Sequence, residues 1–249
     1  MKLHDFIIVN GDTDSIAFKK RDEKPFTEEE QAALLAELNA AMPANIVWKN
    51  DKHYRRVIVF KAKNYVLDDG KKVKVKGSAL KGSKKEPALQ AFTREVIDLL
   101  LKDKKEQVLF AYLRKCNEIG NLSDISPWCF KVTITKKVLD PQAAFQKKIL
   151  AAIGKRPVSE GDKIYLFYKE DGSLCLREDF AGEYDKGRLL GKLRATLEVF
   201  GNVFDVALFP DLTLKRNKEL LESLTPKHHG IFFPHASGAG GTIQLLTRN

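Results

Sequence analysis

The sequence FIIVNGDTDSIAF, residues 6–18, decides how the first part of the chain folds. Two apolar runs, residues 6–9 and 16–18, flank an acidic centre that opens with Asn10-Gly11. Asn-Gly between β-prone runs is a strong hairpin signal, because both residues accept the left-handed backbone of a tight turn. The hairpin would present Asp12 and Asp14 together, since residues two apart in an extended strand face the same side.

Asp12 and Asp14 are candidate magnesium ligands. Two neighbouring carboxylates repel each other unless a cation or a proton lies between them. Mg²⁺ prefers hard oxygen ligands and often takes only one or two carboxylates together with substrate phosphates. The alternative is a solvated acidic turn, because Asp and Asn favour turns for purely local reasons.

The composition suits a globular protein with a polyanionic partner. The chain has 249 residues, of which 43% are hydrophobic, enough for one large or two moderate domains. No apolar run approaches the ~20 residues of a membrane helix. The three cysteines form no C-x-x-C pair, which argues against a zinc ribbon or iron–sulfur site and predicts a reducing, cytoplasmic location. The net charge of +10 favours nucleic acid as the partner.

A lysine-rich segment follows between residues 57 and 85. Residues 57–67 are predicted to be a strand that places Lys61, Lys63 and Tyr65 on one face, and residues 71–77 return beyond an Asp-Asp-Gly turn. A basic loop then covers residues 79–85. Lysines on an edge strand can simply prevent aggregation. The alternative is a surface for a nucleic-acid backbone, with small residues permitting close approach. The predicted DNA-contacting residues are Lys61, Lys63, Tyr65, Lys74, Lys76, Lys81, Ser83, Lys84 and Lys85.

The remaining pattern predicts an α+β fold: antiparallel hairpins first, then a mainly helical part with a small β insert. Thr27 and Glu30 form a capping-box pattern at a helix start. The expected parts are residues 1–85, residues 86–225 and a flexible tail, 226–249. Expected helices cover residues 88–114, 145–153, 184–200 and 213–224, and expected strands cover 128–135, 163–168 and 174–176. His228, His229 and His235 match no standard set of metal ligands.

Three features in this order resemble the C-terminal part of family B DNA polymerases, particularly those of bacteriophages and large viruses. They are Gly11-Asp12-Thr13-Asp14-Ser15, the Lys63-Asn64-Tyr65 strand, and Lys76-Gly77 with its basic loop. In that family an Asp-Thr-Asp-Ser hairpin in the palm holds catalytic magnesium, and a Lys-Lys-Arg-Tyr strand contacts primer–template DNA. Asn10 departs from the usual aromatic residue, and Ala62 and Asn64 depart from the second motif.

The resemblance implies roles for individual residues. Asp14 would be the direct metal ligand and Asp12 would support the site, while Lys63 and Tyr65 would contact DNA. Residues 1–85 would be the C-terminal half of the palm and residues 86–225 the thumb that grips duplex. The peptide Ile243-Gln244-Leu245-Leu246 resembles those by which polymerases dock onto sliding clamps, so a clamp is a further expected partner.

The family's upstream metal-binding Asp motif, its fingers helix and its exonuclease domain have no counterpart in this sequence. A two-metal site needs ligands on both sides of the metal pair. We therefore expect the C-terminal subunit of a split DNA polymerase, with Mg²⁺ bound at a site completed by a partner chain that carries exonuclease, fingers and the remaining palm. A fragment of a longer polymerase, a non-catalytic nucleic-acid-binding or processivity module, and a metal-dependent nuclease are the alternatives.

Overall fold

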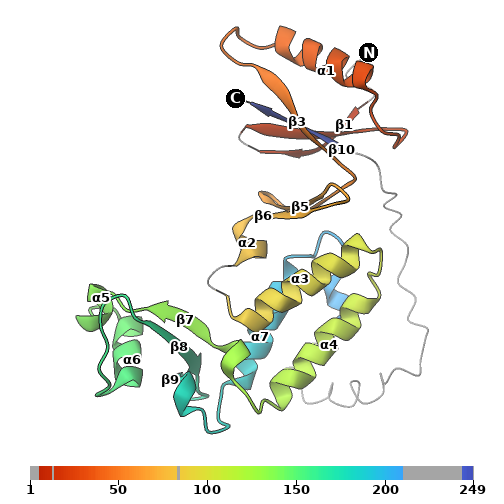
Figure 1. Ribbon diagram of the computed structural model, residues 1–249. Coiled ribbons are helices and arrows are strands. Elements are labelled where there is room, and N and C mark those ends of the chain that lie inside the picture. The colour runs from red at the N-terminus through yellow and green to blue at the C-terminus, as the bar shows by residue number, and fades with distance from the viewer. Residues whose placement is uncertain (1–5, 13, 83–84, 210–242, 249) are drawn as a thin grey trace. The chain divides into compact units, whose positions relative to one another are not determined.

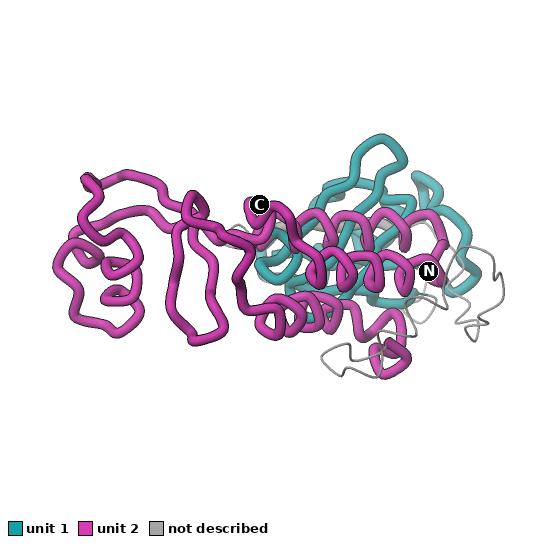
Figure 2. The backbone as a smooth tube through the Cα atoms, turned by 90° about the horizontal axis from the view of Figure 1, so that it is seen from below, with its two compact units in different colours: residues 1–81, 233–249 teal, residues 82–232 magenta. Residues whose placement is uncertain are grey.

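The computed structural model describes residues 6–12, 14–82, 85–209 and 243–248 of the chain, the last of these for the backbone only. It confirms the predicted α+β class, with antiparallel hairpins and a mainly helical part that carries a small sheet. The chain forms two compact units, residues 1–81 with 233–249 (unit 1) and residues 82–232 (unit 2), which Figure 2 shows in different colours.

Unit 1 contains an antiparallel sheet in the order β1-β2-β10-β3. Helix α1 covers one of its faces, where Phe6, Phe18, Phe26 and Leu34 form a buried cluster (Figure 1). The predicted capping box is confirmed, because Thr27 accepts from the Glu30 N–H and Glu30 accepts from the Thr27 N–H. The elements are β1 (Phe6–Gly11), β2 (Ser15–Lys20), α1 (Glu28–Ala40), β3 (Trp48–Tyr54) and β10 (Ile243–Arg248).

A second antiparallel sheet of unit 1 has the order β4-β5-β6 and is followed by a short helix, α2. Ala17 and Phe18 are neighbours in β2, yet Ala17 is buried with Tyr54, Tyr65 and Leu67, whereas Phe18 is buried on the α1 side. Strand alternation therefore gives the first sheet two buried faces. The bounds are β4 (Arg56–Lys61), β5 (Asn64–Asp68), β6 (Val73–Lys76) and α2 (Ser78–Lys81).

The single strand predicted for residues 57–67 is wrong. The chain turns at Ala62-Lys63, so that Lys61 pairs with Asn64 and Val59 pairs with Tyr65 in neighbouring antiparallel strands. Lys63 occupies the left-handed region with φ of 60°, a conformation that side-chain-bearing residues seldom adopt. Ala-Lys carries no ordinary turn signal, which is why the pattern of β-prone residues concealed the hairpin.

The described residues of unit 2 form three longer helices, α3, α4 and α7, and a small sheet in the order β7-β8-β9. The one helix expected over residues 88–114 is instead two, because the chain turns between α3 and α4 through Asp103, whose φ is 56°. Ile134, Ile149, Leu166 and Leu176 belong to the buried cluster beneath the small sheet. The helices are α3 (Pro87–Leu101), α4 (Gln107–Gly120), α5 (Lys136–Leu139), α6 (Ala144–Ile153) and α7 (Lys186–Glu198), and the strands are β7 (Phe130–Thr133), β8 (Lys163–Tyr168) and β9 (Leu174–Leu176). Short 3₁₀ turns cover Ser126–Trp128, Arg177–Asp179 and Val206–Leu208.

The last part of the sequence is described only at Ile243–Arg248. This segment, expected within a flexible tail, forms β10 and pairs with β2 on one side and β3 on the other. The helix expected at residues 213–224 and the histidines at 228, 229 and 235 lie outside the described residues. Across the described chain, the helices are all too short or too polar to cross a membrane.

Candidate metal and nucleic-acid site

The acidic motif lies at the turn of the β1–β2 hairpin. The hairpin is confirmed, but Asn10 and Gly11 belong to β1, so the turn follows the Asn-Gly pair and does not contain it. The Asp12 N–H donates to the Ser15 carbonyl at 2.8 Å, which closes the turn. An irregularity between Ile8 and Asn10 shifts the register of β1 against β2. Asp14 is exposed and Asp12 is partly exposed.

The Lys-x-Tyr motif belongs to the β4–β5 hairpin and lies next to the β1–β2 turn. Lys63 Nζ lies 3.7 Å from Asp12 Oδ1, and both groups belong to unit 1. Burial raises the pKa of the Tyr65 phenol, and the negative charges of Asp12 and Asp14 raise it further. Two motifs separated by about fifty residues of sequence are therefore neighbours in the folded chain, within electrostatic reach of each other.

The position of Lys63 depends on a compact support beneath its turn. The Asn64 side-chain amide donates to the Ala62 carbonyl at 2.9 Å, and its Oδ1 accepts from the Ala79 N–H at 2.9 Å. Gly77 lies against this amide with φ of 98°, and a Cβ there would come within 2.3 Å of the Lys63 carbonyl oxygen. Asn64 and Gly77 thus connect the lysine turn to the start of α2. Asn64 departs from the family motif, and sequence reasoning assigned it no role.

The predicted DNA-contacting residues do not all lie together. Tyr65 is buried, Lys61 ends β4, and Lys63 is in the turn, so the expected common face of these three residues is wrong. Lys74 and Lys76 lie opposite Leu67 and Tyr65 on β6, an edge strand of its sheet. Of the other predicted contact residues, Lys81 is exposed at the end of α2, and Lys85 belongs to unit 2. Ser83 and Lys84 lie outside the described residues.

Two acids close to these lysines are already neutralised. Asp68 pairs with Arg55 at 2.7 Å, and Asp69 pairs with Lys52. Asp69 also accepts from the Lys71 and Lys72 N–H groups, and together these bonds hold the pKa of its carboxyl well below the usual range. Neither acid therefore opposes the positive charge of β6 and α2.

The carboxylates of Asp12 and Asp14 suit a magnesium ion whose coordination is completed by groups outside this chain. Their oxygens are the donors that Mg²⁺ prefers, and one or two carboxylates suffice when substrate phosphates complete the coordination. The described hydrogen bonds and ion pairs include none to the Asp14 carboxylate. No group of three or more His, Cys, Asp or Glu side chains suited to a metal occurs in the part of the chain that the structure describes.

The sequence also carried no local signal for an aromatic pocket in unit 2. Its rings come from β7, α6 and β8, three elements whose proximity only the fold establishes.

No protein-family model matches this chain, and no curated protein sequence matches it. What the chain does must therefore be inferred from its own residues.

Proposed function

We propose that this chain is the C-terminal subunit or fragment of a family B DNA polymerase, a DNA-directed nucleotidyltransferase that is active only with a partner chain. The observation that carries the proposal is the meeting of the acidic turn and the Lys-x-Tyr hairpin at Lys63 and Asp12. In the family that the sequence resembles, both motifs serve one primer–template site. An accidental match of two separate motifs would give no reason for them to be neighbours.

Each residue then has a role that follows from its chemistry. Asp14, which is exposed, would bind Mg²⁺ directly, and Asp12, which already interacts with Lys63, would be the secondary ligand. Bound Mg²⁺ would supply Lewis-acid activation of the primer 3′-hydroxyl and of the α-phosphate. Lys63, whose side chain is 72% exposed, would place its ammonium group against a DNA phosphate. Tyr65 would support the turn from within the core.

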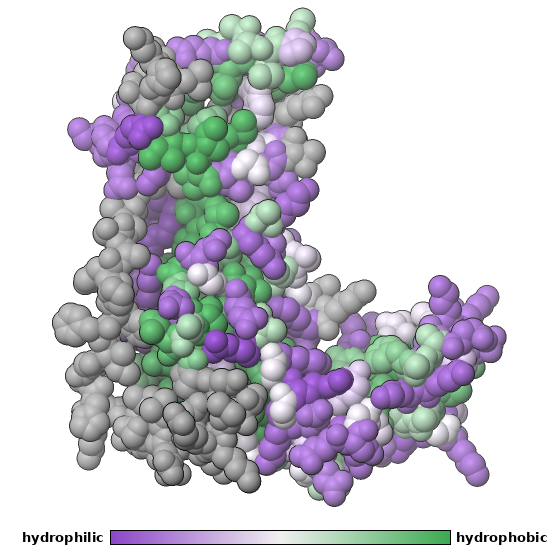
Figure 3. All heavy atoms as spheres, turned by 180° about the vertical axis from the view of Figure 1, so that it is seen from behind, coloured by the Kyte–Doolittle hydropathy of each residue, from purple (hydrophilic) through white to green (hydrophobic). Residues whose placement is uncertain are grey.

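The edge of the first sheet gives the partner chain a place to bind. Strand β1 pairs on one side with β2, and the described strands include no neighbour on its other side. Ile8 in β1 is 64% exposed, more than any other large apolar side chain of the described residues, and Figure 3 shows apolar surface on the visible face of unit 1. A strand from the partner would cover Ile8 and pair with the backbone groups on the edge of β1 that faces away from β2.

A sliding clamp is a less direct partner. The peptide Ile243–Leu246 is part of β10, and its backbone pairs with strands on both sides. Docking onto a clamp would require this strand to leave the sheet. The clamp therefore competes with the fold of unit 1 for the same residues.

One observation favours a second candidate, a non-catalytic nucleic-acid-binding or processivity module. The Lys63 ammonium lies close to Asp12, so a cation of the protein itself already offsets one of the two carboxylates. A module of this kind would need the basic surface but not Asp14. The two candidates therefore differ in what Asp14 contributes.

Primer extension tests the proposal, with this chain alone and with the polypeptide encoded beside it. We expect extension only with both, and we expect Asp14→Asn to lower its rate at least about 100-fold while DNA affinity is kept, because metal ligation contributes several kcal/mol. The matched control is Asp51→Asn, an exposed carboxylate in β3 of the same unit. Robust extension by this chain alone would contradict the split-subunit role, and so would failure to bind any polymerase-like partner. Equal activity of the two variants would favour the binding module.

A further inference from the structure

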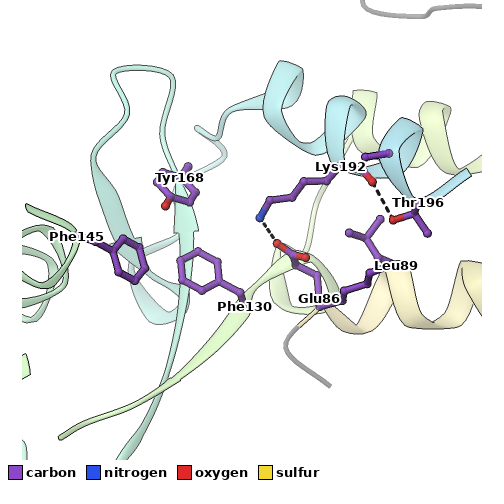
Figure 4. Close-up of a pocket in the computed structure, with 9 residues that line it drawn as sticks. Glu86, Leu89, Phe130, Phe145, Tyr168, Lys192 and Thr196 are labelled. Carbon is purple, nitrogen blue, oxygen red and sulfur yellow. Dashed lines mark hydrogen bonds and ion pairs between the residues drawn. The ribbon is translucent and has the colours of Figure 1, made fainter. Parts of the chain in front are cut away.

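Unit 2 contains a cavity of about 450 Å³ for which the proposed polymerase role has no use (Figure 4). This volume lies within the range of small-ligand sites, roughly 300–1,000 Å³. Phe130, Phe145 and Tyr168 supply its aromatic wall, and Lys85, Glu86 and Lys192 supply its charged groups.

The aromatic rings form a series of nearly parallel faces. Phe145 and Phe130 have centroids 6.4 Å apart and ring planes inclined by 29°, while Phe130 and Tyr168 are 5.6 Å apart at 28°. The Arg188 guanidinium extends the series at 3.7 Å from the Tyr168 centroid. Phe145 at the other end is 45% exposed, although exposed Phe side chains are costly to leave in water. The series therefore ends in an open aromatic face next to the cavity.

The charged groups of the cavity favour an anion. The carboxylate of Glu86 is buried and pairs with Lys192, whose ammonium lies 5.3 Å from the Phe130 centroid and 5.8 Å from the Tyr168 centroid. Glu86 is thus neutralised within the wall and holds Lys192 beside the rings, as Figure 4 shows. With Lys85 the lining carries two lysines and one carboxylate. Lysine ammonium groups are common contacts of nucleic-acid phosphates, and here one of them lies beside an aromatic surface.

We propose that this cavity binds an unpaired nucleotide of a single-stranded nucleic acid. Its base would stack on the open face of Phe145, and its phosphate would approach Lys85 and Lys192. Stacking on aromatic side chains and positive charge beside the backbone are the two means by which proteins hold single strands. Bases in the interior of a duplex are stacked on both sides and do not present a free face to Phe145. The site takes no part in metal binding, so the proposal stands independently of the polymerase role.

Fluorescence anisotropy of a labelled oligothymidylate of about eight nucleotides, titrated with the full chain, tests this proposal. We expect Phe145→Ala to weaken binding about 5- to 150-fold, the loss that removal of one base–aromatic stack causes. Phe145→Tyr should restore binding because it keeps the ring. The matched control is Phe110→Ala in α4, since Phe110 is 40% exposed and does not line the cavity. Circular dichroism checks that each variant is folded.

The outcomes separate this site from general electrostatic attraction. Binding of a blunt duplex of the same length should be the same for Phe145→Ala and for the unaltered chain. Equal losses for Phe145→Ala and Phe110→Ala, or equal losses for duplex and single strand, would overturn the proposal. Displacement of the oligomer by thymidine monophosphate at equal nucleotide concentration would also overturn it, because the site would then take free nucleotides. Since no catalysis is measured, failure here leaves the test of Asp14 unaffected.

Discussion

Replacing Gly77 by alanine should disturb the turn that carries Lys63. Gly77 has a φ of 98°, and a Cβ added there would lie 2.3 Å from the Lys63 carbonyl oxygen and 2.3 Å from Asn64 Oδ1. A carbon atom cannot stay that close to either oxygen. One of these oxygens belongs to the backbone, so the β4–β5 turn must move away from α2. The hydrogen bonds of Asn64 to Ala62 and Ala79 would weaken with it.

The size of the effect can be separated into two contributions. Holding alanine in left-handed backbone costs about 1–2 kcal/mol. Relieving the overlap by shifting the turn costs about 1–3 kcal/mol more, as overpacking does elsewhere. Gly77→Ala should therefore destabilise this sheet by about 2–5 kcal/mol. Gly70 is the matched control, because its φ is 85° and the nearest atom to an added Cβ lies 4.0 Å away, so that Gly70→Ala meets only the first cost.

Hydrogen exchange measured on peptides from residues 56–76 is the suitable assay, because it reports the opening free energy of this sheet separately from unit 2. Amides of β5 should lose more protection in Gly77→Ala than in Gly70→Ala, by about 1–3 kcal/mol. Equal protection in the two variants would refute the packing role of Gly77. It would also refute the inference that Asn64 and Gly77 hold Lys63 beside Asp12.

Two further predictions concern alkaline stability and the charge of the lysine turn. Burial raises the pKa of the Cys116 and Cys129 thiols from an ordinary value of 9.0 to about 12, so the unfolded chain loses these protons first as pH rises. The free energy of unfolding should then fall above about pH 9, by about 1.4 kcal/mol per pH unit for each thiol. Urea unfolding at several alkaline pH values measures this slope, and an unchanged slope in Cys129→Ala would contradict the assignment. Lys63→Gly should change the free energy of unfolding by less than about 1 kcal/mol, because glycine tolerates the positive φ. It should nevertheless weaken duplex DNA binding and lower the slope of log affinity against log salt concentration by about 1. An unchanged slope would exclude a phosphate contact.

Local sequence patterns predicted the elements whose cause is local. The capping box of α1, the β1–β2 hairpin and the β5–β6 hairpin all follow from turn and cap residues that act over a few positions. The break between α3 and α4 escaped prediction because apolar residues continue at helical spacing across it. Strand β3 escaped because its sequence, WKNDKHY, is polar and lacks alternation.

Local sequence patterns do not predict which strands pair when they lie far apart in the sequence. Strand β10 lies over two hundred residues from β2 in sequence, and its pairing between β2 and β3 depends on the whole of unit 1. The candidate site shows the same limit. The acidic pair and the Lys-x-Tyr motif were visible as residue types, but their proximity came from the packing of Ala17, Tyr54 and Tyr65 between the two sheets.

The conformation of Lys63 is the strongest physical reason to regard the acidic turn as functional. A lysine with positive φ costs about 1–2 kcal/mol. The ion pair at 3.7 Å between the exposed Lys63 and the partly exposed Asp12 returns only about 1 kcal/mol. Asparagine or glycine would form the same turn at lower cost. The turn therefore does not hold a lysine for stability, and strained residues of this kind concentrate at binding and catalytic sites. A DNA phosphate beside a bound metal would be a stronger partner for the Lys63 ammonium group than Asp12 alone. On this view the pair with Asp12 is a resting arrangement, which primer–template binding would replace.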